Sequence, residues 1–308
     1  MPKLAQLPGG VAVNPEQVLY LRAGADTSEG TGDDAPHSIF LRIQGFNQPA
    51  PLARHPNRAA AEAAMASLKE AMDAATDGGD AEMVVLPRGI AVKTEEMVYV
   101  EVIREKTASG PTYVVRTKLE SEDRPLELGT FADAKDAVAL SKGCGEALGE
   151  DFVHLSGGLT IRNRKAQRIE VVADRNPGQL LFRAVIKCQS EPRRLTIGMS
   201  PDRAKIEAIA EKARAAINEV TDEDEHLAPL GLGFAIRPDG LKGLRVRAQR
   251  VTVSGAQKTV FQVMLLTDDD EEQPFSVVET GEEAEALVKS TVASFNDAQP
   301  SDDDDDWD

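Results

Sequence analysis

The chain has 308 residues, of which 41% are hydrophobic but only 4% aromatic, and it carries a formal net charge of −17 at pH 7. A chain of this length can form one large domain or several small ones, with cores built mainly from Val, Leu, Ile and Ala side chains. The charge argues against general adhesion to nucleic acids or anionic membranes, and no apolar run approaches the roughly 18 residues of a membrane-spanning helix.

The two ends of the chain differ in character. Residues 1–6 lack the apolar segment of a signal peptide, and the two cysteines, Cys144 and Cys188, show no patterned spacing, which fits a reducing, cytoplasmic compartment. The C-terminal tail, residues 297–308, contains seven Asp and no basic residue. This low-complexity tail is predicted to be disordered.

A glycine followed by a short alternating strand occurs four times in the chain. These glycines are Gly10, Gly89, Gly158 and Gly233. They are 79, 69 and 75 residues apart. Helix starts recur at nearly the same spacing, with alanines 75, 70 and 80 residues apart at positions 59, 134, 204 and 284. Two independent markers at one period predict a tandem repeat.

Each predicted repeat continues with three further strands and one helix with a single apolar stripe. The second strands are 17–22, 97–102, 168–172 and 244–248, the third are 39–43, 113–117, 180–184 and 260–263, and the fourth are 51–53, 125–128, 194–197 and 275–278. The helices are predicted at 59–72, 134–148, 204–220 and 284–295. Thr280 and Glu283 have the spacing of a capping box, whereas repeat 1 has His55 at the expected cap position.

These elements predict an α+β fold of four tandem ββββα repeats, in which each antiparallel sheet packs on one helix. The predicted boundaries are 1–80, 81–151, 152–226 and 227–296, followed by the tail at 297–308. A unit of about 75 residues buries too little surface to be stable alone, so neighbouring repeats are expected to pair. We expect pseudo-dimers of repeats 1 with 2 and 3 with 4, although a closed ring or a row of four gives the same pattern.

Signals for catalysis or metal binding are weak. The four histidines, His37, His55, His154 and His226, are predicted to be exposed in loops or at element ends, outside any ligand spacing. Glycine pairs precede a strand, whereas a phosphate-binding loop follows a strand and opens a helix. Acidic runs such as 268–272 lack the glycine-punctuated alternation of a calcium loop and are interpreted as solvated loops. The sequence therefore predicts no enzyme, no metal site and no cofactor.

Basic residues on the predicted strands form the one patterned candidate for binding. The residues are Arg42, Arg116 and Arg183, assigned to one repeat position, with Lys118, Lys187, Arg245 and Arg247 added from neighbouring positions. A sheet face with periodic basic residues and aromatics can follow a single-stranded backbone and stack its bases. The stacking candidates are Tyr20, Phe40, Phe46, Tyr99 and Tyr113. The alternative is a solvated sheet face whose arginines pair with loop acids.

The end of the tail carries a first resemblance. Asp302, Asp303, Asp304, Asp305 and Asp306 precede Trp307. The segment resembles the C-terminal tails of bacterial and bacteriophage single-stranded-DNA-binding proteins, in which acid near an aromatic residue competes with DNA and docks replication or repair partners. The resemblance implies that the tail folds back on the basic face and that Trp307 anchors a partner. It covers about 7 of the 308 residues, and the bacterial tails usually end on Phe.

The predicted element order carries a second resemblance, over nearly the whole chain. Tandem four-strands-plus-helix repeats that pair into a double unit are similar to the PUR-repeat and Whirly class, which binds single-stranded nucleic acid on curved sheets. No PUR-type sequence signature is present, so no binding residue is carried over, and a shared architecture does not establish a function.

Together these features predict a non-enzymatic, sequence-tolerant single-stranded nucleic-acid-binding protein, viral or replication-associated, with an autoinhibitory and partner-docking tail. The alternative is a protein-interaction or assembly module, such as a virion, scaffold or sequestering protein, whose repeats provide multivalent sheet edges or grooves. In one form of this alternative the acidic surface mimics DNA. An enzyme and a small-ligand pocket between repeats are the remaining alternatives.

Overall fold

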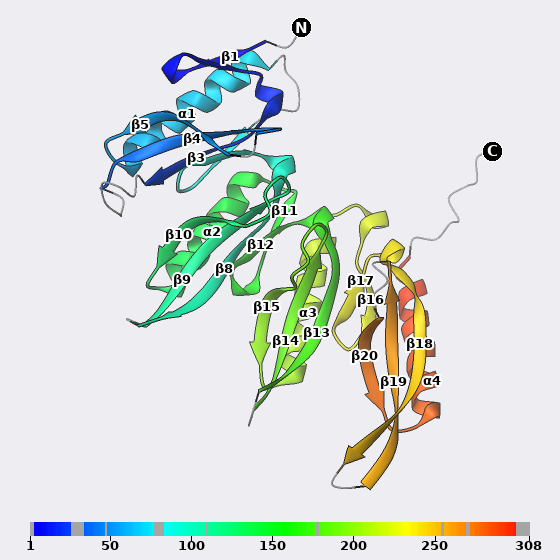
Figure 1. Cartoon of the computed structure of the whole chain (residues 1–308). Coiled ribbons are helices and arrows are strands. Elements are labelled where there is room, and N and C mark those ends of the chain that lie inside the picture. Colours follow the sequence, from blue (N-terminus) through cyan, green and yellow to red (C-terminus); the bar gives the residue numbers. More distant parts are fainter. Residues whose placement is uncertain are drawn as a thin grey trace, which may run out of the picture. The chain divides into compact units, whose positions relative to one another are not determined.

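The computed structural model describes residues 3–25, 34–46, 48–76, 83–108, 110–176, 179–253, 256–268 and 272–299. Within these residues the protein has an α+β fold, with four α-helices that pack against antiparallel sheets (Figure 1). No described helix has both the length and the apolar character needed to cross a bilayer. The acidic run and Trp307 lie outside the described residues. The chain divides into two compact parts, residues 1–154 with 158–162 and residues 155–157 with 163–308.

In the described residues, each helix is preceded by a two-stranded hairpin and three further strands, which we call a hairpin and a sheet–helix unit. Hairpin 1 is β1 (Ala5–Leu7) and β2 (Val11–Val13), and unit 1 is β3 (Val18–Ala25), β4 (His37–Ile43), β5 (Ala50–His55) and α1 (Arg58–Ala75). Hairpin 2 is β6 (Met83–Leu86) and β7 (Ile90–Lys93), and unit 2 is β8 (Met97–Thr107), β9 (Gly110–Leu119), β10 (Leu126–Phe131) and α2 (Ala134–Leu148). Hairpin 3 is β11 (Phe152–Leu155) and β12 (Leu159–Arg162), and unit 3 is β13 (Ala166–Asn176), β14 (Gln179–Cys188), β15 (Leu195–Ser200) and α3 (Arg203–Asn218). Hairpin 4 is β16 (Ala228–Gly231) and β17 (Phe234–Ile236), and unit 4 is β18 (Leu241–Val253), β19 (Ala256–Thr267), β20 (Glu272–Val278) and α4 (Gly281–Asn296).

The sequence predicted four strands for each helix, and the described residues have five. The missed strands are β1, β6, β11 and β16, which have only three or four residues each and are too short to display alternation. The turn that follows each of them contains two residues in the left-handed region, such as Arg88 and Gly89, both with φ of 74°. The glycines that seemed to open a repeat are therefore turn residues inside a hairpin.

Hairpins 2, 3 and 4 each add to the sheet of the unit that precedes them in the chain. The strand orders are β5-β4-β3-β7-β6, β10-β9-β8-β12-β11 and β15-β14-β13-β17-β16. The sequence led us to expect each repeat to form its own sheet, but alternation identifies a strand without identifying its neighbour. Two elements lack this pairing among the described residues, because hairpin 1 forms a separate two-stranded sheet and unit 4 keeps the three-stranded order β18-β19-β20.

The three junctions between a unit and the following hairpin share one register. In each unit, the pairing of the first strand with the second shifts register near the start of the first strand. Across the junction, the first residue after this shift faces the third residue after the glycine of the next hairpin. The pairs are Tyr20 with Val92, Tyr99 with Ile161 and Arg168 with Ile236. The same shift in β18 falls between Leu241 and Gly243. Gly243 is therefore the counterpart, in unit 4, of the residue that pairs with a hairpin in the other units.

Hairpin 2 contributes side chains to two cores. Met83 and Ala91 pack in the core under α1, whereas Leu86, Ile90 and Val92 pack in the core under α2. Successive side chains of a strand point to opposite faces, so a hairpin between two helices buries both of its faces. The shared hairpin ties unit 1 to unit 2 within the first part of the chain.

The helices repeat one burial pattern when they are counted from their N-caps. The caps are Asn57, Asp133, Asp202 and Thr280. Positions 4, 8, 11 and 15 after the cap are buried in α1, α2 and α3, whereas Val288 and Phe295 at positions 8 and 15 of α4 are only partly buried. The predicted capping box at Thr280 is confirmed. His55 is not the cap of α1, since the Asn57 side chain accepts a hydrogen bond from the Ala60 backbone N–H.

Candidate interaction surface

The predicted basic row does not occupy a single register position. The cross-strand pairs nearest the register shift are Arg42 with Tyr20, Lys118 with Tyr99 and Lys187 with Arg168. Arg42, Lys118 and Lys187 are therefore counterparts, and Arg116 and Arg183 lie two and four residues before that position in their own strands. The predicted alignment was wrong because a shift by two residues preserves the alternation on which it was based.

Each arginine of this predicted row forms an ion pair with a carboxylate. The pairs are Arg42 Nε with Glu122 Oε1 (2.9 Å), Arg116 Nη2 with Glu105 Oε1 (2.6 Å) and Arg183 Nε with Asp174 Oδ2 (2.7 Å). Partly exposed pairs of this kind contribute little to stability. They do, however, use the same guanidinium donors that a nucleic-acid phosphate would need.

The two lysines of the row are bound to backbone carbonyls of the loops beside them. Lys118 is buried, and its ammonium group donates to Leu119 O at 3.0 Å and to Glu122 O. Lys187 Nζ donates to Pro192 O at 3.1 Å. Both side chains therefore hold the turn that follows their strand.

The aromatic candidates are divided between core and surface. Tyr20 and Tyr99 are buried, so neither ring can stack on a base in this structure. Burial and the nearby Glu122 carboxylate raise the pKa of Tyr20 above its ordinary value. Phe40 and Tyr113 are partly buried, and Phe46, at 65% exposure, is the one stacking candidate that is open to solvent.

Strand β18 carries a separate basic patch. It has four basic residues and no acidic one, at positions 242, 245, 247 and 250. Arg245 Nη1 lies 3.1 Å from Glu272 Oε1. Arg247 and Arg250 are exposed and have no charged or hydrogen-bonding partner among the described residues. Arg247 is therefore the predicted basic residue that is left without a described partner.

In hairpins 2, 3 and 4, a basic residue four positions after the glycine ties the hairpin to the short turn that leads into the preceding unit. The contacts are Lys93 Nζ to Glu16 O (2.8 Å), Arg162 Nη1 to Glu95 O (3.1 Å) and Arg237 Nη2 to Asn163 O (3.0 Å). Hairpin 1 has Asn14 at this position, and its side chain instead caps the short helix that follows. The sequence carries this signal in the spacing of the three basic residues, which are 69 and 75 residues apart.

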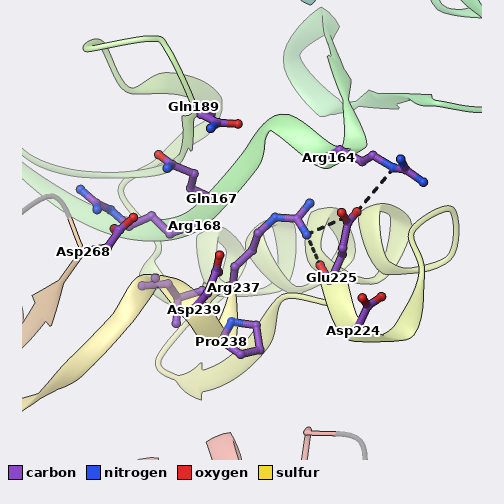
Figure 2. Close-up of a pocket in the computed structure, with 12 residues that line it drawn as sticks. Arg164, Gln167, Arg168, Gln189, Asp224, Glu225, Arg237, Pro238, Asp239 and Asp268 are labelled. Atoms are coloured by element: carbon purple, nitrogen blue, oxygen red, sulfur yellow. Dashed lines mark hydrogen bonds and ion pairs between the residues drawn. The ribbon is translucent and has the colours of Figure 1, made fainter. Parts of the chain in front are cut away.

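A cavity lies beside the Arg237 contact (Figure 2). It has a volume of about 500 Å³, and its lining includes Arg164, Arg168, Arg237 and Asp268. Figure 2 shows Arg237 reaching toward Glu225, whose carboxylate also lies 3.6 Å from Arg164 Nε. Burial lowers the pKa of Arg237. Because these charged groups bind one another, we interpret the cavity as a structural contact and not as a ligand-binding site.

All four histidines are less exposed than the sequence predicted, since His37 is buried and His55, His154 and His226 are partly buried. His37 is buried in β4, and its Nδ1 lies 2.8 Å from Ala35 O. His154 lies in β11, where Nδ1 is 2.8 Å from Thr160 Oγ1, and Ser141 Oγ is 3.2 Å from the same oxygen. Burial is the main cause that lowers the pKa of His154. No carboxylate joins this network in the distances described, and Thr160 is fully buried, so the group is a satisfied polar contact inside the fold. No cluster of metal-ligating side chains occurs in the described ranges.

The clearest unpaired surface is the outer edge of β18. We call residues 243–246 the acceptor edge. Leu244 is partly exposed, whereas its counterparts Leu21, Val100 and Ile169 are buried. Val246 is 39% exposed. Within the described ranges no strand pairs with this edge, although the corresponding edge in units 1, 2 and 3 is covered by a hairpin.

Hairpin 1 is the matching unpaired element at the other end of the chain, and we call it the donor hairpin. One face packs on the core under α1 through Ala5, Leu7 and Val13. The opposite face presents Leu4 and Ala12 to solvent. Leu4 is 60% exposed, whereas its counterpart Met83 in hairpin 2 is 1% exposed. Sequence reasoning missed both surfaces, because they are defined by the absence of a neighbour and not by a residue pattern.

Comparison of the chain with protein-family models, with curated proteins and with solved structures gave no match.

Proposed function

We propose that the chain is a non-enzymatic assembly module that binds a protein partner by strand addition at the acceptor edge. The observation that carries this proposal is the outer edge of β18, with which no described strand pairs, whereas its counterparts β3, β8 and β13 each pair with a hairpin. An open strand offers a row of unpaired N–H and C=O groups, which other chains can pair with. The neighbouring apolar side chains Leu244 and Val246 would supply the contact area.

The arrangement of the elements supports this proposal. We infer that the four hairpin-and-unit segments are copies of one repeat, joined in a row by hairpins that reach back to the preceding unit. Among the described residues, this arrangement pairs each internal junction and leaves hairpin 1 and unit 4 without a partner strand, as in other repeat proteins whose contacts are limited to neighbours. Pairing into pseudo-dimers is a different arrangement of the same repeats, and the register shared by all three junctions favours the row.

A peptide experiment tests strand addition directly. A labelled peptide with the sequence of residues 227–237, which forms hairpin 4 and covers Val171 in unit 3, is expected to bind the full chain. Binding should slow amide hydrogen exchange at residues 243–246, because exchange reports the opening of backbone hydrogen bonds. A scrambled peptide and the Val246→Glu chain are the controls. If the peptide leaves exchange at these residues unchanged at saturating concentration, strand addition at this edge is excluded.

A second candidate function is the binding of single-stranded nucleic acid by unit 4. It is favoured by Arg247 and Arg250, which are exposed and without a partner among the described residues. In this proposal the acidic tail competes for the same patch, in the way that the tails of single-stranded-DNA-binding proteins compete with DNA.

Anisotropy of a labelled oligo-dT tests this second candidate. Deleting residues 300–308 is expected to raise its affinity for the chain, and Arg247→Glu in the deleted chain is expected to lower it. Affinity should fall steeply with salt, and loss of one phosphate contact should reduce the logarithmic salt slope by about 1. Lys142→Glu on α2 makes the same reversal of charge outside the β18 patch and is the matched control. Failure of the tail-deleted chain to bind oligo-dT at low salt would rule the candidate out.

A further inference from the structure

We infer that the partner of the acceptor edge is the donor hairpin of a second copy of this chain, so that the protein associates head to tail. The inference rests on the proposed function, strand addition at β18, and it names the strand that is added. Hairpins 2, 3 and 4 each have an acceptor within the chain, whereas the donor hairpin has none among the described residues and unit 4 has no donor. A second copy supplies both missing elements at once.

The donor hairpin has the apolar face that a junction needs. The residue six positions before the hairpin glycine is Leu4, Met83, Phe152 or Leu227 in hairpins 1 to 4. In the three hairpins that cover a sheet, this residue is at most 8% exposed, and Leu4 is 60% exposed. Ala12 is exposed as well, whereas its counterparts Ala91 and Ala235 are buried. The face that is buried in every internal junction is therefore intact and uncovered in hairpin 1.

The acceptor edge carries Val246 at the position on which a hairpin glycine packs in the other units. A Cβ atom at Gly89, Gly158 or Gly233 would lie 2.9, 2.6 or 2.6 Å from the side chain of Ala23, Val102 or Val171. The register places Val246 at this position in unit 4, where it is 39% exposed. A Cβ at Gly10 would meet nothing within 4 Å in its own chain. Hairpin 1 thus supplies the glycine, and unit 4 the valine, of the close contact that is seen in the three junctions.

The shared register specifies how the two elements meet. The three junctions are antiparallel, with the third residue after the glycine facing the residue after the register shift. By the same rule Val13 of one copy faces Gly243 of the other, Ala12 faces Leu244 and Val11 faces Arg245. Gly10 then lies over Val246, and Leu4 lies toward the partly buried Val288 of α4.

The contact is expected to be weaker than an internal junction. Internal junctions are joined by the chain itself and by the basic residue at position 93, 162 or 237. Asn14 stands at this position in the donor hairpin, so that contact is lost. Small interfaces are usually transient, and a head-to-tail contact that does not close extends into open chains. Association should therefore increase continuously with concentration.

Sedimentation velocity of the full chain over a wide concentration range tests the inference. The weight-average mass is expected to rise with concentration. Leu4→Asp, which alters only the donor hairpin, and Val246→Glu, which alters only the acceptor edge, are each expected to remain monomeric. Because head-to-tail association needs one intact half from each partner, an equimolar mixture of the two variants should form dimers and stop there, with a mass about twice that of either alone.

Several controls distinguish a failure of self-association from a failure of strand addition itself. Val277→Asp, at a 59% exposed position on β20 at the opposite edge of the same sheet, should associate like the unchanged chain. Gly10→Asn keeps a residue that tolerates positive φ but adds a side chain over Val246, and it should also be monomeric. A chain that stays monomeric at every concentration, or a variant mixture that forms no dimer, overturns the inference. If the 227–237 peptide still binds in that case, strand addition stands and the partner is a different protein.

Discussion

Gly233→Ala is expected to lower the free energy of unfolding of the second part of the chain by about 3 kcal/mol. Two costs combine. Gly233 has a φ of 76°, where an L-residue costs roughly 1–2 kcal/mol. The new Cβ would also lie 2.6 Å from Val171 Cγ2 and 3.2 Å from the Cα of Glu207, and forcing an atom into a packed site costs typically 1–3 kcal/mol. Urea denaturation with an unchanged m value measures the loss.

Gly10→Ala is the matched control for this prediction. Gly10 has nearly the same φ, 75°, but a Cβ there meets no atom within 4 Å. Only the backbone cost of roughly 1–2 kcal/mol is therefore expected. Equal losses for the two variants would show that the close packing of the hairpin turn against β13 contributes nothing.

Glu170→Ala is expected to destabilise the fold by about 3–5 kcal/mol, because it leaves a buried guanidinium without its carboxylate. Glu170 is 2% exposed and Arg168 is 3% exposed, and Arg168 Nε lies 2.6 Å from Glu170 Oε1. Arg194 Nε lies 2.9 Å from Glu170 Oε2. The carboxylate therefore serves two cations, one of them in the core.

Two further variants test whether this loss of stability comes from the buried charge that is left unpaired. Arg194→Ala removes only the partner that is 39% exposed, and a change below about 1 kcal/mol is expected. The double replacement Arg168→Met with Glu170→Leu removes both buried charges and should recover most of the stability, since an apolar pair of similar volume often replaces a buried ion pair without loss. A double variant as unstable as Glu170→Ala would mean that the pair does more than neutralise its own charges.

Local features of the fold could be read from the sequence. The helices lie where the apolar stripes placed them, and the Thr280 capping box forms as its spacing indicated. The period of the hairpin glycines reflects a backbone requirement, since all four have φ between 74° and 78°. Cys144 lies within the helix predicted at 134–148, Cys188 ends β14, and both are buried and outside any disulfide. These features depend on neighbouring residues in the chain, which a sequence displays directly.

Features that depend on neighbours in space could not be read in the same way. Alternation in residues 90–93 marks a strand, but it does not reveal that β7 pairs with β3. Alternation is also unchanged by a shift of two residues, and this placed Arg116 in the wrong register. The partners of Arg42 and Lys118 come from a loop at position 122, which no pattern in the strand itself announces.

The shared hairpins bear on how this protein can be divided or lengthened. A cut between α1 and β6 would remove two of the five strands from the sheet of unit 1, while a cut after β7 would leave that sheet whole. A fragment that keeps the whole sheet of unit 1 thus ends one hairpin later than the helix boundary suggests. For the same reason, duplication of a segment that runs from one hairpin to the next would insert a donor and an acceptor together. The chain could then gain or lose whole segments without inventing a new contact.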